Sequence, residues 1–503
     1  MIFITDKLNK SILDPIHGLI KMSDDEIKIV SHPLFNRLRK VKQNTFLYYV
    51  FPSANHTRFE HSIGVMHLAS EMLLSALSNA STSRDKQEKY KIEGNGSILT
   101  YDSVSEEEFI NIFLDLRIAA LLHDIGHGPM SHLFDEFAPK SSAFLSMIRN
   151  DENLKFNEEL ANALEHLIES KKGTESHVEH EYVSYYFTAK VLTDLGFDSD
   201  RIKAILTIMN EKLNLRTIET AGYNITPFLN QIVAGAPLDC DRMDYLLRDS
   251  YFTGVKYGTY DLNRLLKSLL PFIDNESSSI RLGIKKSGLP AVENFLQARY
   301  ELYIQVYFHK TNQACNTMLS CATKGLKAAG YEFVECSTPE KFIADYLNLS
   351  DEKFLDYIEN ATESQDKMTI HELKNRKIWK RIFEEYPKEE MMREDIKSRI
   401  NNIKGVIIQS DRALEPFIGS CITENDPLKD LNGEKAVLLN KDDSGDFCIS
   451  GKDDWIKDSI IFNALSSKYL VGRIYMRANT EGDKGKQNFR EIKQMIQDHL
   501  INK

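Results

Sequence analysis

The residues with the clearest chemical potential are His123 and Asp124, which are adjacent in the run LLHDIGHGPMSH. They follow an apolar segment, and the Gly-His-Gly-Pro turn at 126–129 predicts that a helix ends there. Such a turn would carry His127 and His132 back over whatever the adjacent pair binds. Since an unpartnered charge beside apolar AALL is costly to bury, and since imidazole and carboxylate suit divalent ions, the run predicts a metal site.

A mononuclear metal site needs more ligands than one adjacent pair supplies. His61, in HTRFEHSIGV, lies early in an amphipathic pattern and is one candidate, with a capped or packed histidine as the alternative. A second candidate is an aspartate in PLDCDRMDYLLRDS, a segment of helical character that contains Asp239, Asp241, Asp244 and Asp249. For each of these four acids a solvated helix face is the alternative.

Composition limits the class of protein. The chain has 503 residues, is 42% hydrophobic and can therefore bury a full core. Its formal net charge of -11 disfavours broad nucleic-acid contact, so an anionic substrate would need a local cationic site or a metal. We recognise neither a signal peptide nor a membrane span, and the six cysteines form no CxxC pair, so we expect a cytoplasmic protein with reduced thiols.

The pattern of hydrophobic residues changes along the chain. Helical periodicity dominates residues 1–330, with polar insertions expected at about 84–108 and 141–176. The segments 404–410, 434–440 and 468–478 are rich in β-branched or aromatic residues, which is typical of strands. We therefore predict a large helical domain over 1–330 and a smaller α+β lobe over 331–503, with a role in oligomerisation or regulation.

Several motifs in order along the chain identify a family resemblance. HDIGHGP, the upstream RFEHSIGV and the downstream DRMDYLLRD resemble the HD-domain phosphohydrolases. DPIHGLI, FNRLRKVKQ and YYVFPSANHTRFEHS narrow the resemblance to the deoxynucleoside triphosphate triphosphohydrolases. It covers most of residues 10–330 and implies a mainly α fold, in which a helical HD-domain core precedes the α+β lobe.

The resemblance implies a complete ligand set for a divalent ion, which would be Mn, Mg, Fe or Zn. The four metal ligands would be His61, His123, Asp124 and Asp241. Among the crowded aspartates it selects Asp241 over Asp239, because Asp241 begins the D-[RK]-x-D-Y run.

The resemblance also implies which residues surround the substrate. Those near the reacting phosphate would be His127, His132, Asp135, His180 and Glu181. His132 would be the general acid, and His180 would orient or deprotonate the attacking water while Glu181 fixes its ring. Gln43 would contact the deoxyribose, and the phosphates and sugar would be held by Arg58, Arg242, Tyr245, Asp249, Arg299 and Tyr307. The alternatives are surface charges for Arg58 and Arg299, and core aromatic residues for Tyr245 and Tyr307. For His132 and His180 the alternative is an ordinary packed or exposed histidine.

Two positions depart from the family pattern. Ser31 stands where the family has an aspartate that reads an activating guanine base, and a hydroxyl cannot accept the paired donors of guanine as a carboxylate can. Asn36 and Arg39 remain as residues that could hold a phosphate-bearing effector. Asn44 follows Gln43 in place of an apolar residue, which would alter discrimination at the sugar.

These inferences converge on metal-dependent hydrolysis of deoxynucleoside triphosphates to a deoxynucleoside and inorganic triphosphate. Nucleotide effectors and a homo-oligomer, either a dimer or a tetramer, would accompany this activity. One alternative is an HD-type phosphodiesterase or nuclease acting on an oligonucleotide or signalling nucleotide, which the net charge disfavours. The other is a non-catalytic nucleotide sensor, which would have no need of all four ligands and the catalytic histidines.

Overall fold

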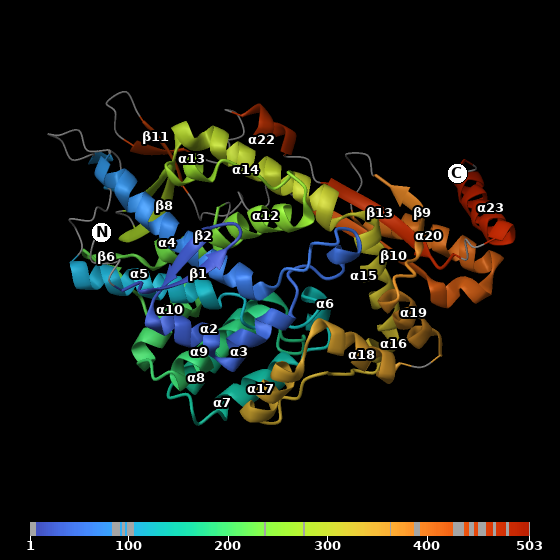
Figure 1. Cartoon of the computed structure of the whole chain (residues 1–503), viewed down its shortest axis with the longest axis horizontal. Helices are drawn as coiled ribbons and strands as arrows, with labels where there is room; N and C mark the ends of the chain where they lie inside the picture. Colours follow the sequence, from blue (N-terminus) through green and yellow to red (C-terminus); the bar gives the residue numbers. More distant parts are fainter. Residues whose placement is uncertain are drawn as a thin grey trace.

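The structure, a computed structural model, is mainly helical with small sheets, so the predicted fold class is confirmed (Figure 1). It describes residues 7–82, 91–92, 96–97, 105–235, 238–274, 277–362, 364–386, 393–425, 437–441, 447–450, 459–465, 469–478 and 482–501. None of the helices in these ranges is long and apolar enough to cross a membrane.

A bundle of long helices forms the centre of the molecule. Its members are α4 (Arg58–Thr82), α5 (Glu106–Leu122), α9 (His180–Asp194), α10 (Ser199–Met209), α11 (Thr226–Ala234) and α12 (Cys240–Thr253). The Ser105 side chain caps α5 by accepting from the Glu108 amide, and three acidic residues occupy its first turn. From Leu116 to Leu122 every residue of α5 is buried, and α4, α10 and α11 pack against this helix. The run that contains the predicted metal ligands therefore begins where the buried part of α5 ends.

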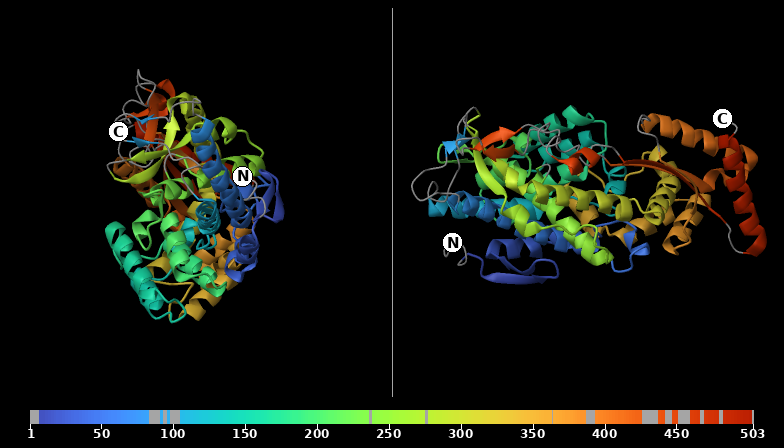
Figure 2. Two further views of the ribbon diagram at one scale, coloured as in Figure 1. Left: turned by 90° about the vertical axis from the view of Figure 1, so that its left-hand side faces the viewer. Right: turned by 90° about the horizontal axis from the view of Figure 1, so that it is seen from above.

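The N-terminal segment lies along one side of this bundle (Figure 2). It comprises β1 (Lys10–Asp14), β2 (Gly18–Met22), α2 (Asp24–Ser31), α3 (Pro33–Asn36), η1 (Arg37–Lys40) and η2 (Leu47–Tyr49). Ser23 and Glu26 form a capping box at the start of α2. The buried Glu26 carboxylate also accepts from Arg117 of α5, at 2.6 and 2.9 Å, so this ion pair fastens the segment to the bundle.

The two predicted insertions differ in how far the structure describes them. Most of the insertion predicted at about 84–108 lies outside the described residues, apart from β3 (Lys91–Ile92), β4 (Gly96–Ser97) and the start of α5. The segment 141–176 forms α7 (Ser141–Arg149) and α8 (Asn157–Lys171), which pack together and bury their apolar faces. Between α5 and α7 lies the short α6 (His132–Asp135).

A mixed sheet and a second group of helices follow the bundle. The strand order is β12-β11-β8-β6-β5, and β7 also pairs with β8. The bounds are β5 (Glu219–Thr220), β6 (Tyr223–Asn224), β7 (Leu269–Asp274), β8 (Ser279–Lys285), β11 (Val437–Lys441) and β12 (Phe447–Ser450). The helices are α13 (Leu262–Leu266), α14 (Leu289–Leu302), a π-helical turn at Tyr303–Tyr307, α15 (Lys310–Ala322) and α16 (Lys324–Ala328). The segment 290–326 is therefore helical but interrupted at 303–309.

The C-terminal part contains two kinds of packing, while the predicted domain division at residue 330 stays a prediction. Helices α17 (Pro339–Asn348), α18 (Asp351–Ala361) and α19 (Ser364–Lys374) bury apolar residues in the same core as the bundle. Beyond them a separate core forms among β9 (Lys380–Glu385), α20 (Arg393–Ser410), β10 (Ile418–Asn425), β13 (Tyr469–Met476) and α23 (Gly482–Ile501). The strands form an antiparallel sheet of order β10-β13-β9, at one end of the molecule (Figure 2).

One predicted strand is wrong. Residues 404–410 form the last part of α20, whereas β11 and β13 appear within the other two predicted strand segments. Ile396, Ile400, Ile403 and Ile407 recur at helical spacing and bury one face of α20 against the sheet. This longer period overrides the β-branched composition of KGVIIQS, because burial against the neighbouring sheet outweighs local propensity.

The helical packing of α20 predicts a difference between two nearby residues. Ile407→Ala should lower the free energy of unfolding by about 2–4 kcal/mol, because Ile407 is fully buried and its truncation leaves a cavity. Gln409→Ala, at an exposed position of the same helix, should change it by less than about 0.5 kcal/mol. Urea denaturation followed by tryptophan fluorescence measures both, and equal effects would contradict the helical register.

Candidate metal centre and active site

Three helix ends bring the four predicted metal ligands together. His61 lies in the first turn of α4, His123 and Asp124 follow α5, and Asp241 lies in the first turn of α12. The Asp241 Oδ1 atom is 3.1 Å from His61 Nε2 and 3.7 Å from His123 Nε2. Asp124 completes the group, with carboxylate oxygens 3.5 Å from His123 Nε2 and 3.8 Å from His61 Nε2.

The hydrogen bonding of both imidazole rings fits a bound cation. The His61 Nδ1 atom pairs with Asp244 at 2.7 Å, and His123 Nδ1 donates to the Ala120 carbonyl at 2.8 Å. The Nε2 atom of each ring is buried and has no hydrogen-bond partner. A neutral ring that donates through Nδ1 presents a lone pair at Nε2. The two Nε2 atoms can therefore act as nitrogen ligands beside the Asp124 and Asp241 carboxylates.

The electrostatics of the centre also favour a divalent ion. Burial lowers the pKa of His61, but Asp241 and Asp244 more than offset this effect and raise it to about 10. For Asp241 burial raises the pKa, whereas His123 and His61 bring it below its ordinary value. The negative potential that would attract a proton to these rings would equally attract a metal cation.

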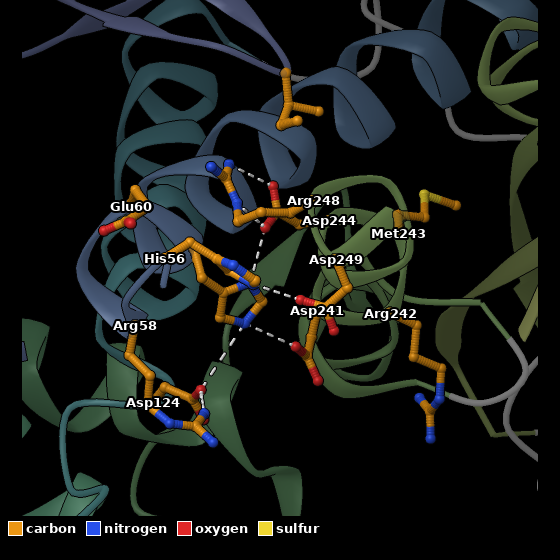
Figure 3. A network of polar contacts seen from close by, with 12 residues as sticks. His56, Arg58, Glu60, Asp124, Asp241, Arg242, Met243, Asp244, Arg248 and Asp249 are labelled. Carbon is orange, nitrogen blue, oxygen red and sulfur yellow. Dashed lines mark hydrogen bonds and ion pairs between the residues drawn. The ribbon is translucent and has the colours of Figure 1, made fainter. Parts of the chain in front are cut away.

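Asp244 connects the centre to the rest of the fold. Its side chain is fully buried and accepts from His61, from His17 Nε2 at 2.7 Å, and from Arg248 at 2.8 and 2.9 Å. The contact between Arg248 and Asp244 is drawn in Figure 3. Arg248 in turn donates to Asp14 at 2.8 Å. Sequence reasoning left Asp244 among open alternatives and missed the roles of His17 and Asp14. The signal available was the i, i+4 spacing of Asp244 and Arg248, together with the polar ends of DPIHG.

Close packing of α4 on α12 depends on Gly64. A Cβ atom at this position would lie 2.0 Å from Asp244 Oδ1 and 2.4 Å from Arg248 Nη2. No side chain can therefore be accommodated between the two helices at this point without moving the buried ion pair.

Arg58 links the ligands to the turn that follows them. Its guanidinium donates to the Asp124 carboxylate and to the Ser131 hydroxyl, and its side chain is buried. Met130 and Ser131 have φ values of 57° and 55°, a left-handed backbone that costs non-glycine residues about 1–3 kcal/mol each. Arg37, which sequence reasoning missed, donates to the Ile125 and His127 carbonyls and holds the preceding part of the turn.

The predicted catalytic histidines form a second group beside the metal ligands. The His127 and His180 rings stack with centroids 3.6 Å apart. Asp135 Oδ2 is 3.0 Å from His180 Nδ1 and 3.7 Å from His132 Nδ1, whereas Glu181 is 3.5 Å from the same His180 atom. Asp135 is thus the closer partner that orients His180, a role predicted for Glu181.

These histidines differ in exposure and charge. The His132 side chain is 77% exposed, whereas that of His180 is 8% exposed. Burial lowers the pKa of His180, but the hydrogen bond to Asp135 and the charge of Glu181 raise it above its ordinary value. For His127, burial and the charges of Arg58 and His180 lower the pKa well below its ordinary value, and Asp124 offsets only part of this effect.

An open cavity of about 290 Å³ adjoins Arg58 and His132. Its lining includes several predicted substrate residues, namely Gln43, Tyr245, Asp249 and Tyr307, together with Asn44. The Asp249 carboxylate accepts from His56 Nε2 at 2.6 Å and from the Tyr307 hydroxyl at 2.5 Å. Both of its oxygens therefore already have protein donors, and Asp249 fixes the cavity wall.

Four other predicted binding residues are not part of the lining of this cavity. Arg242 pairs with Asp239, which caps α12, and points away from the metal ligands (Figure 3). Arg299 lies over the Tyr303 ring, 5.4 Å from its centroid. The proposed effector residues Asn36 and Arg39 are exposed and bond to each other at 2.8 Å.

Comparison with known proteins finds family models and relatives that match most of this chain. Residues 58–220 match the HD domain family, and residues 260–405 match the HD associated region. An uncharacterised protein of Methanocaldococcus jannaschii is 28% identical over 377 residues, which cover 74% of this chain and 63% of that protein. Human deoxynucleoside triphosphate triphosphohydrolase SAMHD1 is 29% identical over 391 residues, covering 75% of this chain and 55% of the human protein.

A solved structure of a phosphohydrolase from Bacteroides thetaiotaomicron shares the fold. Its TM-score is 0.61 at 24% sequence identity, and the match covers 93% of this chain and 99% of that one. By contrast, the matched region spans little more than half of the human relative, and less than two thirds of the archaeal protein.

The Asp244 network predicts a specific effect on metal binding. Asp244→Asn should weaken Mn²⁺ binding by about 10- to 100-fold, because an amide holds the His61 ring less firmly and reduces the negative potential. Isothermal titration calorimetry of the metal-free protein measures this affinity. Asp198→Asn, which alters an exposed helix cap remote from the centre, is the control and should bind Mn²⁺ normally. Unchanged affinity in Asp244→Asn would contradict the positioning role.

Proposed function

Because this chain is an HD-domain protein of the metal-dependent phosphohydrolase type, we propose that it hydrolyses deoxynucleoside triphosphates to deoxynucleosides and inorganic triphosphate. The observation that carries the proposal is that two groups of ligating side chains lie side by side next to a cavity, which Arg58 lines while it donates to Asp124. Two buried imidazoles with free Nε2 atoms face two carboxylates, and a histidine–aspartate cluster lies beside them. The name of the human relative supports the choice of substrate.

The residues of this chain divide the chemical work among them. Arg58, already in contact with Asp124, would neutralise charge on the phosphoryl oxygens. His180, held by Asp135, would accept a proton from the attacking water. His132, exposed at the cavity, would donate a proton to the leaving 5′-oxygen, which is a poor leaving group without one.

The remaining residues would bind and orient the nucleotide. A divalent ion at His61, His123, Asp124 and Asp241 would supply Lewis-acid polarisation of a phosphoryl oxygen. Gln43 and Tyr245 line the cavity and would contact the sugar and phosphates, with Tyr307 and Asp249 shaping the wall. Arg242 and Arg299 are not part of the cavity lining, so their side chains would need to extend into the cavity to take part.

Regulation and assembly belong to the same proposal. A nucleotide effector would bind near Asn36 and Arg39, which are exposed and lie outside the substrate cavity. Assembly into a homo-oligomer would involve the C-terminal lobe. The expected ion is divalent Mn, Mg, Fe or Zn, and a cytoplasmic nucleotide pool is the expected source of substrate.

Product analysis tests the proposed reaction. The purified protein with Mn²⁺ or Mg²⁺ should convert at least one deoxynucleoside triphosphate, offered singly or in mixtures, into a deoxynucleoside and triphosphate. Chromatography distinguishes these products from pyrophosphate or orthophosphate. His123→Ala and Asp241→Ala should lower turnover to background, because each removes a predicted ligand.

Two outcomes would replace the proposal with another function. Cleavage of single-stranded DNA without turnover of any mixed nucleotides would indicate a nuclease. Nucleotide binding without turnover would indicate a sensor. Asp345→Asn, in a helix remote from the metal ligands, should retain wild-type activity and serves as the control.

The contact between Asp135 and His180 predicts a shift in pH dependence. Because Asp135 raises the pKa of His180, and because a proton acceptor must be unprotonated, kcat/KM should fall as pH drops through that pKa. Asp135→Asn should move this acidic limb to lower pH and reduce kcat by about 10-fold or more, since His180 loses its orienting partner. A pH–rate profile at saturating Mn²⁺ measures both effects, and an acidic limb at wild-type position would count against His180 as the base.

A further inference from the structure

A buried carboxylate in α18 lies where three distant parts of the chain meet. Asp351, the first residue of α18, is only 4% exposed. Its Oδ2 atom accepts from the Lys42 amide at 2.8 Å, and its Oδ1 atom accepts from the Met130 amide at 2.7 Å. A first-turn aspartate commonly faces solvent or its own helix, so two remote backbone donors are an unusual set of partners.

The first of these donors, the Lys42 amide, belongs to the extended segment 41–43, which pairs with segment 56–58. Lys42 forms an isolated β-bridge with Thr57, and the Arg58 amide donates to the Val41 carbonyl at 3.0 Å. The next residue is Gln43, whose amide donates to the His56 carbonyl at 3.1 Å. A hydrogen bond that fixes Lys42 therefore also fixes the neighbouring backbone of Gln43 and Arg58, which both line the cavity.

The second donor belongs to the turn that carries His132. Met130 and Ser131 are the two left-handed residues of this turn, and Ser131 accepts from Arg58. A backbone in this region persists only where its surroundings fix it, and the Asp351 carboxylate supplies one such constraint. Helix α6 and His132 begin immediately afterwards.

Two hydrogen bonds and two positive charges compensate the buried Asp351 carboxylate in part. Burial raises the pKa of Asp351 above its ordinary value, whereas the backbone hydrogen bonds from Lys42 and Met130 and the positive charges of Lys42 and Arg58 limit that rise. A neutral amide at this position could accept from one backbone N–H, but its own N–H₂ group would face the other donor.

We propose that Asp351 is a positioning residue that sets the spacing between the Gln43 segment and the Ser131–His132 turn. Through these two backbone hydrogen bonds, α18 places Arg58, Gln43 and His132 around one substrate. This role rests on the proposed function, in which those three side chains contact the nucleotide. Asp351 itself touches neither the metal ligands nor the cavity.

Kinetics of three variants test this role. Asp351→Ala should lower kcat for deoxynucleoside triphosphate hydrolysis by about 10- to 100-fold, because misplacement by about 1 Å suffices for such a loss. Asp351→Asn should lie between Ala and wild type. Asp345→Ala is the matched control, since Asp345 of neighbouring α17 also accepts a remote backbone amide, from Glu335 at 3.1 Å.

Two further measurements separate positioning from a merely structural role. Bound Mn²⁺ should be the same in all variants, because the metal ligands are untouched. Amide hydrogen exchange should become faster in residues 41–46 and 128–133 of Asp351→Ala, with other core peptides unchanged. A lower Tm with wild-type kcat and KM well below that temperature would overturn the proposal, as would unaltered exchange in both segments.

A second substrate distinguishes failure of the proposed function from failure of the positioning role of Asp351. If the wild-type protein turns over no deoxynucleoside triphosphate, bis(p-nitrophenyl) phosphate with Mn²⁺ serves as a substrate that reports on the centre without a nucleotide. Asp351→Ala must then hydrolyse it at least about 10-fold more slowly than Asp345→Ala. Equal rates would overturn the role of Asp351 whatever the natural substrate is.

Discussion

The buried carboxylate of Asp244 is the interaction on which the arrangement of the centre depends. It accepts from His61, His17 and Arg248, and through Arg248 it reaches Asp14. Removing one partner from a buried ion pair typically costs about 3–5 kcal/mol, because the other charge is left uncompensated. The N-terminal hairpin, α4 and α12 are therefore coupled to the orientation of one imidazole ring, and fold stability and ligand geometry share the same contacts.

The active site is assembled from backbone contacts as much as from side chains that could touch a substrate. Arg37 donates hydrogen bonds to two carbonyls of the turn after α5, and Asp351 accepts hydrogen bonds from the amides of two separate segments. Both have ionisable side chains that are buried, and both are remote in sequence from the residues they hold. Such contacts explain how a turn with a left-handed backbone can keep a fixed shape beside the catalytic histidines.

Local pattern predicted some features of this protein and could not predict others. The HDIGH run marks a helix end because glycine and proline act on their immediate neighbours, and His61 and Asp241 follow from recognisable motifs. The contacts of Asp351 could not be predicted, because an aspartate that follows a serine is typical of any helix start. The β-branched composition of residues 404–410 predicts a strand, whereas the helix is recognisable only from the longer spacing of the four buried isoleucines of α20.

Gly64 shows that a residue without a functional group can set the shape of a metal centre. The approach of α4 to α12, which brings His61 against Asp241 and Asp244, leaves no room for even one methyl group at this point. The distance between the ligands on α4 and α12 can thus stay short only while position 64 has no side chain. Among diverging relatives, this glycine should be as resistant to replacement as the histidine one turn before it.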